Sequence, residues 1–305
     1  MDERIRRTVW FQRAMISFSL SLLVASCGDV PSCREEAQLP SNSTRVALYA
    51  GDGTSDISVR AADKMFQWMG YSVTRLTAND IIDDGLDAFN LLCVPGGDMY
   101  QYAQDLSLPG IERIRRFVGD GGGYIGICGG GYFTGERVVW QGNELPMTSL
   151  ELFPGTTRGP IDEIAPYPDC TMCKLNIVEA THPITQSTPD TAWILYCYGP
   201  LFVVDTDAQV SVLGRYEIGN RPAMAAFGFG LGRVFIIGTH PEFEEDSERD
   251  DVEWGDTFDD EGSVWELMRK AALWCLKSED VRSERRSSEG EQGAEGTFRP
   301  TIHFR

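Results

Sequence analysis

Cys128 lies at the centre of a glycine-rich stretch and is the side chain of this sequence best placed to act as a nucleophile. Gly126 precedes it by two positions and Gly130 follows it by two, which gives a G-x-C-x-G pattern. This is the cysteine version of a nucleophile elbow, in which a strand turns sharply into a helix and small flanking residues let the backbones approach. The free N–H groups of that helix favour a thiolate and a developing oxyanion.

The G-x-C-x-G pattern alone is equally consistent with a buried structural cysteine on a central strand. A phosphate-binding loop is less consistent with it, because no Lys-Ser or Lys-Thr pair follows and three consecutive glycines, 129–131, would weaken the helix that such a loop needs. The choice between a nucleophile and a core cysteine therefore depends on the rest of the chain.

A cysteine nucleophile needs a base, and the chain contains three histidines. His303 is in the polar C-terminal segment, and His182 is in a turn next to a proline. His240 directly follows an apolar segment that is typical of a strand, so it is expected at the carboxyl end of that strand.

Glu242 follows His240 by two positions, and side chains two apart in an extended chain point the same way. Pro241 restricts the backbone between them. The alternative for His240 is an ordinary hydrogen-bonded histidine at a strand end. The paired glutamate and the separate elbow favour a Cys128–His240–Glu242 triad, in which the glutamate orients the imidazole.

The elements before Cys128 alternate between strand and helix. Strands are predicted at 45–51, 71–76, 88–94 and 124–127, and amphipathic helices at 55–70 and 110–118. This order indicates an α/β fold with a doubly wound, mainly parallel sheet. Ligands bind such sheets beyond the carboxyl ends of the strands, where Gly51, Gly97 and Cys128 are expected to share one rim.

The pattern changes to β-rich after Cys128. We predict a helix at about 130–139 and then an antiparallel β-rich excursion from the same domain. Its segments are 150–154, 174–180, 193–204 and 210–216, followed by a hairpin of 223–230 and 232–238 and a final helix at 264–276.

Four motifs carry a resemblance to a known family. They are AGDGT at 50–54, VPGGD at 94–98, GICGGG at 126–131 and THPE at 239–242. Over residues 45–277 the chain resembles the class I glutamine amidotransferase-like superfamily, and within it most of all the biotin–protein ligase N-terminal domain-like family. The resemblance implies a flavodoxin-like fold with Cys128 as nucleophile, His240 as base and Glu242 as the residue that orients the base.

The resemblance also implies an oxyanion hole made by the backbone N–H groups of Gly97 and Gly129, and it places Gly96, Asp98 and Tyr132 at the substrate. Tyr132 stands where glutamine-hydrolysing members usually have a glutamine four residues after the cysteine. The resemblance therefore implies cysteine chemistry without implying glutamine as the substrate. We recognise neither a synthetase domain nor a biotin-ligase catalytic domain in the chain.

These observations favour a cysteine-dependent hydrolase or amidase acting on the C–N bond of a small amide or peptide. The alternative is a non-catalytic module that keeps the elbow as scaffold and binds a small ligand or a partner. A weaker third hypothesis is a redox-responsive thiol. No cofactor and no metal site are predicted.

Composition limits the classes of partner. The chain has 305 residues, of which 42% are hydrophobic, and a net charge of −19. Such a charge repels the phosphate backbone, so nucleic acid is not expected as a partner. The densely acidic segment 242–261 has no EF-hand spacing, and we interpret it as a solvated loop near the site rather than a calcium site.

The N-terminus has the features of an export signal. Four arginines precede an apolar stretch, 14–26, that is short for a membrane span, and the stretch ends in small residues before Cys27. We predict a lipoprotein-type signal peptide over 1–27 with Cys27 lipidated, although an ordinary signal peptide or an uncleaved anchor also fits. A polar tether (28–44), the folded domain (45–278) and a disordered tail (279–305) follow. The predicted location is the periplasmic side of a bacterial envelope, with membrane contact only through the lipid.

Export changes the interpretation of the eight cysteines, because an oxidising compartment permits disulfides. Cys170 and Cys173 form a single C-x-x-C without a second pair for zinc, so a local or cross-loop disulfide is favoured over two free thiols. Cys197 fits either the core or a disulfide. Cys93 and Cys275 are expected in the core, and Cys33 in the tether.

Overall fold

The computed structural model describes residues 44–244, 248–258 and 262–276. The predicted signal peptide, the lipidation of Cys27, the tether through residue 43 and the tail from 279 lie outside the described residues, as do Cys33 and His303. Within the described part, no helix combines the length and apolar character needed to cross a bilayer.

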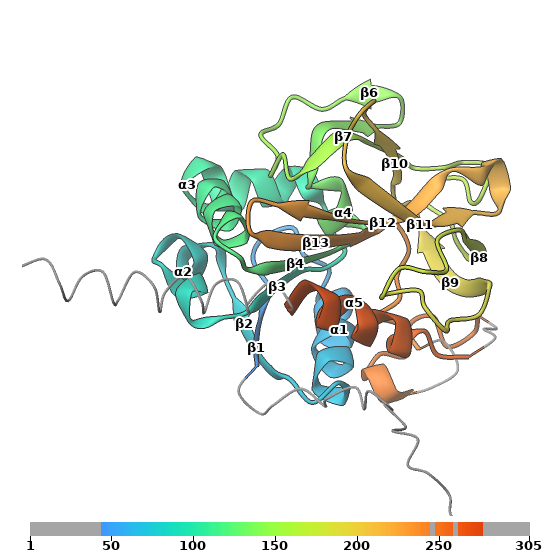
Figure 1. The fold of residues 1–305 in the computed structure, drawn as a ribbon, viewed down its shortest axis with the longest axis horizontal. Helices are drawn as coiled ribbons and strands as arrows, with labels where there is room; N and C mark the ends of the chain where they lie inside the picture. Colours follow the sequence, from blue (N-terminus) through green and yellow to red (C-terminus); the bar gives the residue numbers. More distant parts are fainter. Residues whose placement is uncertain (1–43, 245–247, 259–261, 277–305) are drawn as a thin grey trace, which may run out of the picture. The chain divides into compact units, whose positions relative to one another are not determined.

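The main sheet has nine strands in the order β2-β1-β3-β4-β13-β12-β11-β8-β9 (Figure 1). Its first five strands are mutually parallel and confirm the predicted doubly wound α/β fold. They are β2 (Ser72–Leu76), β1 (Arg45–Tyr49), β3 (Leu91–Val94), β4 (Gly123–Ile127) and β13 (Gly232–Ile237).

Alternation along each central strand divides the core in two. Val46 and Leu48 of β1 pack in a cluster with side chains of α1 (Asp56–Trp68) and α5 (Trp265–Leu276). Ala47 and Tyr49, which point to the opposite face, pack with side chains of α2 (Ala78–Ile82) and α3 (Met99–Gly119). Helices therefore cover both faces of the parallel half.

The other half of the main sheet is antiparallel, as predicted for the β-rich excursion. It contains β12 (Pro222–Phe229), β11 (Val210–Tyr216), β8 (Cys170–Ile177) and β9 (Thr191–Cys197). A separate sheet was not predicted. It has the order β10-β7-β5-β6 and contains β10 (Leu201–Val204), β7 (Phe153–Gly159), β5 (Gly135–Trp140) and β6 (Asn143–Glu144), with β5 and β7 parallel.

Three predicted elements differ in the structure. The helix expected at 130–139 is wrong beyond its first turn: α4 spans only Gly129–Tyr132, and β5 follows, because glycines propagate a helix poorly and Val138-Val139-Trp140 favours a strand. The segment 193–204 is two strands, interrupted before Pro200. Helix α3 starts eleven residues before the predicted Gly110, and its two parts meet at Ser107, where φ is 49°.

Short elements complete the described chain. A capping box between Thr77 and Asp80 starts the unpredicted helix α2. Three 3-10 turns lie at Gly85–Ala88, Ile218–Asn220 and Glu248–Asp250.

The disulfide joins Cys170 of β8 to Cys197 of β9, which are directly paired in the antiparallel ladder. It is therefore a cross-strand link, and Cys173 remains a free, buried thiol. Cys93 and Cys275 are buried and not disulfide-bonded, as predicted for core cysteines.

We expect the double variant Cys170→Ala/Cys197→Ala to lose about 3–4 kcal/mol of unfolding free energy, because the bond closes a loop of 27 residues and restricts the unfolded chain. Denaturant unfolding of the full chain measures this loss. Reductant should destabilise the wild type to the same level and leave the double variant unchanged. Equal stability of all samples would show that the pair is not bonded in solution.

Candidate active site

Cys128 occupies a strained turn between β4 and α4, as a nucleophile elbow requires. Its φ is 47° and its ψ −104°, a conformation that residues with a side chain rarely adopt. The turn leaves no room for a side chain at Gly126, where a Cβ atom would lie 2.6 Å from the carbonyl oxygen of Gly130. The backbone N–H of Cys128 donates to the carbonyl of Ile237 at 2.9 Å, which ties the elbow to β13.

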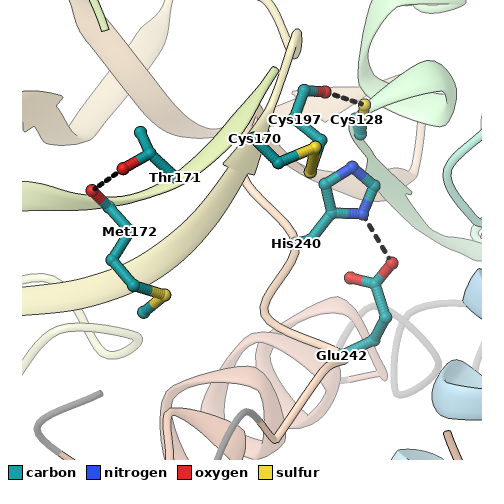
Figure 2. Close-up of a disulfide and its surroundings, with 7 residues drawn as sticks. All are labelled: Cys128, Cys170, Thr171, Met172, Cys197, His240 and Glu242. Atoms are coloured by element: carbon teal, nitrogen blue, oxygen red, sulfur yellow. Dashed lines mark hydrogen bonds and ion pairs between the residues drawn. A yellow bond between two sulfur atoms is a disulfide. The ribbon is translucent and has the colours of Figure 1, made fainter. Parts of the chain in front are cut away.

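His240 and Glu242 follow the end of β13, next to the elbow. Nδ1 of His240 lies 2.9 Å from Oε1 of Glu242, and the backbone N–H of His240 donates to the carbonyl of Leu195 at 2.8 Å. Figure 2 shows the imidazole between the Glu242 carboxylate and the Cys128 sulfur. Glu242 has no exposed surface, and His240 is 7% exposed. The structure thus brings the three predicted triad residues together.

The surroundings of His240 favour its protonated form. Burial lowers the pKa of this imidazole, but the charges of Cys128 and Glu242, and hydrogen bonds with both side chains, raise it by more. The pKa of His240 therefore lies well above its usual value. An imidazole that holds its proton beside a cysteine can stabilise a thiolate.

Ser58 of α1 is a site residue that the sequence did not reveal. Its hydroxyl donates to Oε1 of Glu242 at 2.6 Å and accepts from the backbone N–H of Gly96 at 2.8 Å. The side chain is buried among the apolar residues of the helix face. A serine on the buried face of an amphipathic helix was the one available signal, because such a hydroxyl needs a partner.

The loop 95–98 lies against both the imidazole and the elbow. A Cβ atom on Gly96 would lie 2.6 Å from Cε1 of His240, so the absence of a side chain lets the ring pack on the loop. Gly97 adopts φ +152°. A Cβ atom on Gly129 would lie 2.8 Å from the nitrogen of Gly97, so these two predicted oxyanion-hole residues are close neighbours.

The backbone N–H of Gly97 takes no part in the β-bridge that Gly97 forms with Thr54. The bridge between Thr54 and Gly97 uses the N–H groups of Ser55 and Asp98, which donate to the carbonyls of Gly96 and Gly53. The Gly97 N–H is therefore not consumed by this bridge. It is the type of backbone donor from which oxyanion holes are made.

Two predicted substrate residues also serve the fold. The Asp98 carboxylate caps α3 by accepting from the backbone N–H groups of Tyr100 and Gln101. The Tyr132 hydroxyl donates to the carbonyl of Tyr198 at 3.0 Å, and its ring packs edge-on against Trp140. Burial raises the pKa of the Tyr132 phenol well above its usual value, so it stays neutral. Both residues line the cavity described next.

A cavity of about 590 Å³ opens onto Cys128 and His240. Aromatic side chains form much of its wall, and Ser55, Ser58, Gly97 and the disulfide-bonded Cys197 also border it. The thiol of Cys128 is 3.7 Å from the carbonyl oxygen of Cys197. The volume suits a small molecule or a few residues of a peptide.

The acidic segment is less solvated than predicted. Glu244 and Asp250 are buried, where Glu244 contacts Arg249 and Ser263 and Asp250 accepts from the backbone N–H of Glu244. These contacts fix Glu244 and Asp250, and Phe243 and Trp254 of the described part line the cavity. Among the residues with described positions, no group of three or more His, Cys, Asp or Glu side chains could hold a metal ion.

His182 lies away from the triad. Its ring packs against Trp274 of α5 at 5.2 Å between ring centres, and burial lowers its pKa. It therefore serves as an internal reference for His240.

The sequence profile of the family described as "Biotin-protein ligase, N terminal" matches residues 44–273, which is most of the chain. The chain belongs to this family. The match and the arrangement of strands agree with the class I glutamine amidotransferase-like fold expected from the four motifs.

Two proteins are similar to the chain in sequence over about two thirds of its length. The chain is 29% identical over 217 residues to a biotin–protein ligase from Schizosaccharomyces pombe, covering 65% of this chain and 33% of that protein. It is 27% identical over 216 residues to an uncharacterized protein from Chlamydia muridarum, covering 66% of this chain and 82% of that protein. The chain thus matches only about a third of the ligase's length.

A solved structure, PurLQS from Thermotoga maritima, superposes with a TM-score of 0.52 at 20% sequence identity. The superposition covers 76% of this chain and 99% of that one. At this identity the likeness concerns the fold alone.

We expect Glu242→Gln to lower the pKa of His240, because the neutral amide no longer favours the imidazolium while burial still opposes it. NMR of the imidazole Cε1–H signals against pH measures this shift, and His182 should titrate unchanged in both proteins. An unchanged His240 titration would show that the carboxylate does not act on the ring.

The same shift links pH to stability. Because the pKa of folded His240 lies above the unfolded value of about 6.5, its contribution to stability is complete below about pH 6.5. That contribution is lost as the pH rises through the folded pKa. Denaturant unfolding of wild type and Glu242→Gln across this range should show the loss only in the wild type.

We expect Ser58→Ala to slow alkylation of Cys128 roughly tenfold at neutral pH, because Glu242 and the Gly96 N–H both lose a buried hydrogen bond. The alkylation profile should also move to higher pH, which a purely structural loss would not cause. Ser58→Thr keeps the hydroxyl and should retain most of the rate.

Ser55→Ala is the matched control, since Ser55 lines the same cavity and its side chain makes no capping hydrogen bond. Mass spectrometry of the Cys128 peptide follows the reaction, because several other cysteines are present. Equal alkylation rates for Ser55→Ala and Ser58→Ala would contradict a role of Ser58 in the reactivity of Cys128.

Proposed function

We propose that this protein is a cysteine-nucleophile amidase or hydrolase that cleaves the C–N bond of a small amide or peptide. The observation that carries the proposal is the continuous chain of contacts from Cys128 through His240 and Glu242 to Ser58 at the wall of one cavity. This arrangement supplies a nucleophile, a base and groups that orient the base.

The proposed reaction begins with attack of the Cys128 thiolate on the carbonyl carbon, which forms the C–S bond and places negative charge on the carbonyl oxygen. The backbone N–H groups of Gly97 and Gly129 stabilise that charge. Nδ1 of His240 faces Glu242, so Nε2 is the nitrogen that serves Cys128. The imidazolium then gives its proton to the leaving amine as the C–N bond breaks.

The resulting thioester is resolved by water. Neutral His240 takes a proton from a water molecule, the hydroxide adds to the acyl carbon, and the C–S bond breaks to give the carboxylic acid and the thiolate. Glu242 holds the tautomer in both stages, and Ser58 holds Glu242 and the loop of Gly96.

A non-catalytic binding module on the same fold is the second candidate. It is favoured by Tyr132, which stands where glutamine-hydrolysing members usually have a glutamine. The Tyr132 ring packs against Trp140, and its hydroxyl donates to the carbonyl of Tyr198. The ligase activity named for the Schizosaccharomyces pombe relative belongs to a protein that the chain matches over a third of its length, and we do not transfer it.

We further infer from the sequence that the protein is exported and anchored through a lipid on Cys27. The Cys170–Cys197 disulfide supports an oxidising compartment. Membrane fractionation of wild type and Cys27→Ala tests this part of the proposal separately from the chemistry.

The deciding experiment is the pH dependence of Cys128 alkylation by iodoacetamide in wild type and His240→Ala, with Cys128→Ser as the blank. We expect fast reaction of the wild type near pH 6 and a rate at least tenfold lower in His240→Ala, because that variant loses the imidazolium that stabilises the thiolate. Amide and short-peptide hydrolysis assays then follow.

Slow reaction of both proteins, with the titration of an ordinary thiol, would contradict a thiolate–imidazolium pair and favour the binding module. The other described cysteines outside the disulfide, Cys93, Cys173 and Cys275, are fully or almost fully buried. Peptide mapping therefore separates the Cys128 reaction from any other.

A further inference from the structure

The exposed aromatic side chains of the described chain gather at the candidate active site. Four large aromatic side chains are exposed among the described residues, and three of them, Tyr100, Tyr167 and Trp254, line the cavity at 37%, 50% and 40% exposure. Exposed aromatic groups that cluster at one opening indicate a surface that contacts a ligand.

The aromatic wall continues inward from this rim. Tyr167 contacts Trp140 and Tyr198 with ring centres 5.7 and 5.2 Å apart. Phe243, which also lines the cavity, contacts Trp254 at 5.3 Å and His240 at 5.6 Å between ring centres. Ring faces and edges therefore lead from the opening to the imidazole and the thiol.

The charge of the wall is one-sided. Apart from Cys128 and His240, the only charged side chain lining the cavity within the described residues is Asp98, and neither lysine nor arginine lines it there. The Asp98 carboxylate is exposed. A free amino acid such as glutamine carries a carboxylate, and the one cation on the described part of this wall is the His240 imidazolium, whose charge is already paired with Glu242. An aromatic or cationic group instead finds ring faces and the Asp98 carboxylate.

We propose that the site selects amides that carry an uncharged aromatic or a cationic aromatic group beside the reacting carbonyl and discriminates against anionic ones. This inference rests on the proposed function only in taking an amide as the group that reacts with Cys128. The selection itself is a property of the cavity wall and is measurable as binding without any reaction.

The binding test uses the full chain with Cys128→Ser and two unreactive amides of matched shape, N-benzylacetamide and 4-(acetamidomethyl)benzoate. Titration calorimetry should show N-benzylacetamide binding at least fivefold more tightly than the carboxylate. The trimethylammonium analogue should bind at least as tightly as N-benzylacetamide. Equal affinities, or tighter binding of the carboxylate, would overturn the proposal.

The kinetic test uses the wild type and chloroacetamides with the same groups on nitrogen, followed at the Cys128 peptide. Each rate is divided by that of glutathione with the same reagent, which removes intrinsic reactivity. We expect the N-benzyl and trimethylammonium-benzyl reagents to exceed unsubstituted chloroacetamide by about five- to tenfold, and the carboxybenzyl reagent to fall below the N-benzyl one.

Variants of the rim separate selection from folding. Tyr167→Ala and Trp254→Leu should each reduce the ratio of N-benzyl to unsubstituted rates by at least twofold. Leu108→Ala is the control, because Leu108 is 58% exposed and does not line the cavity. A ratio that stays unchanged in both rim variants would contradict the assignment.

The two levels of proposal fail in different ways. If unsubstituted chloroacetamide reacts fast and depends on His240 while the aromatic ratio equals that of glutathione, the amidase proposal stands and the selectivity proposal falls. If Cys128 is unreactive but N-benzylacetamide still binds selectively, the selectivity stands for a binding module.

Discussion

The buried carboxylate of Glu242 is the constraint on which the site depends. A carboxylate with no exposed surface costs several kcal/mol unless hydrogen-bond donors and an opposite charge surround it. His240 and Ser58 both point at its Oε1 atom, and the indole of Trp265 donates to its backbone carbonyl at 3.2 Å. Removal of either partner would leave part of that cost uncompensated. The same contacts that make Glu242 tolerable inside the domain thus fix the imidazole that faces Cys128.

The sequence predicted the parts of this arrangement that are local. The glycine spacing around Cys128 predicted the elbow, because a tight turn needs small residues at fixed offsets. The apolar strand followed by His240 and Glu242 predicted the base and its partner, because side chains two apart in an extended chain point the same way. The alternation of strands and helices predicted the doubly wound half of the sheet. Each strand, helix or motif used in these inferences was recognised from a pattern within its own segment of the chain.

What the sequence left open depends on contacts between distant segments. Ser58 is 184 positions from Glu242, and no local pattern connects them. The helix predicted after the elbow became β5 because pairing with β7, a tertiary contact, outweighed a continued helix. Cys170 bonded Cys197 rather than Cys173 because antiparallel register, and not spacing along the chain, set the two side chains opposite each other. Asp250 is buried where its carboxylate accepts from the backbone N–H of Glu244, a contact that the density of acidic residues does not reveal.

Strand register is therefore the step that turns these separate segments into one site. Ile127 pairs with Ile237, and the N–H of Cys128 donates to the carbonyl of Ile237, so the elbow is fixed relative to the chain that leads to His240. A slip of one residue between β4 and β13 would turn the side chains of one strand to the opposite face of the sheet and break the packing of both cores. The two cores, one on each face, thus hold the register that places the thiol beside the imidazole. The stability of the sheet and the geometry of the site consequently depend on the same strand register.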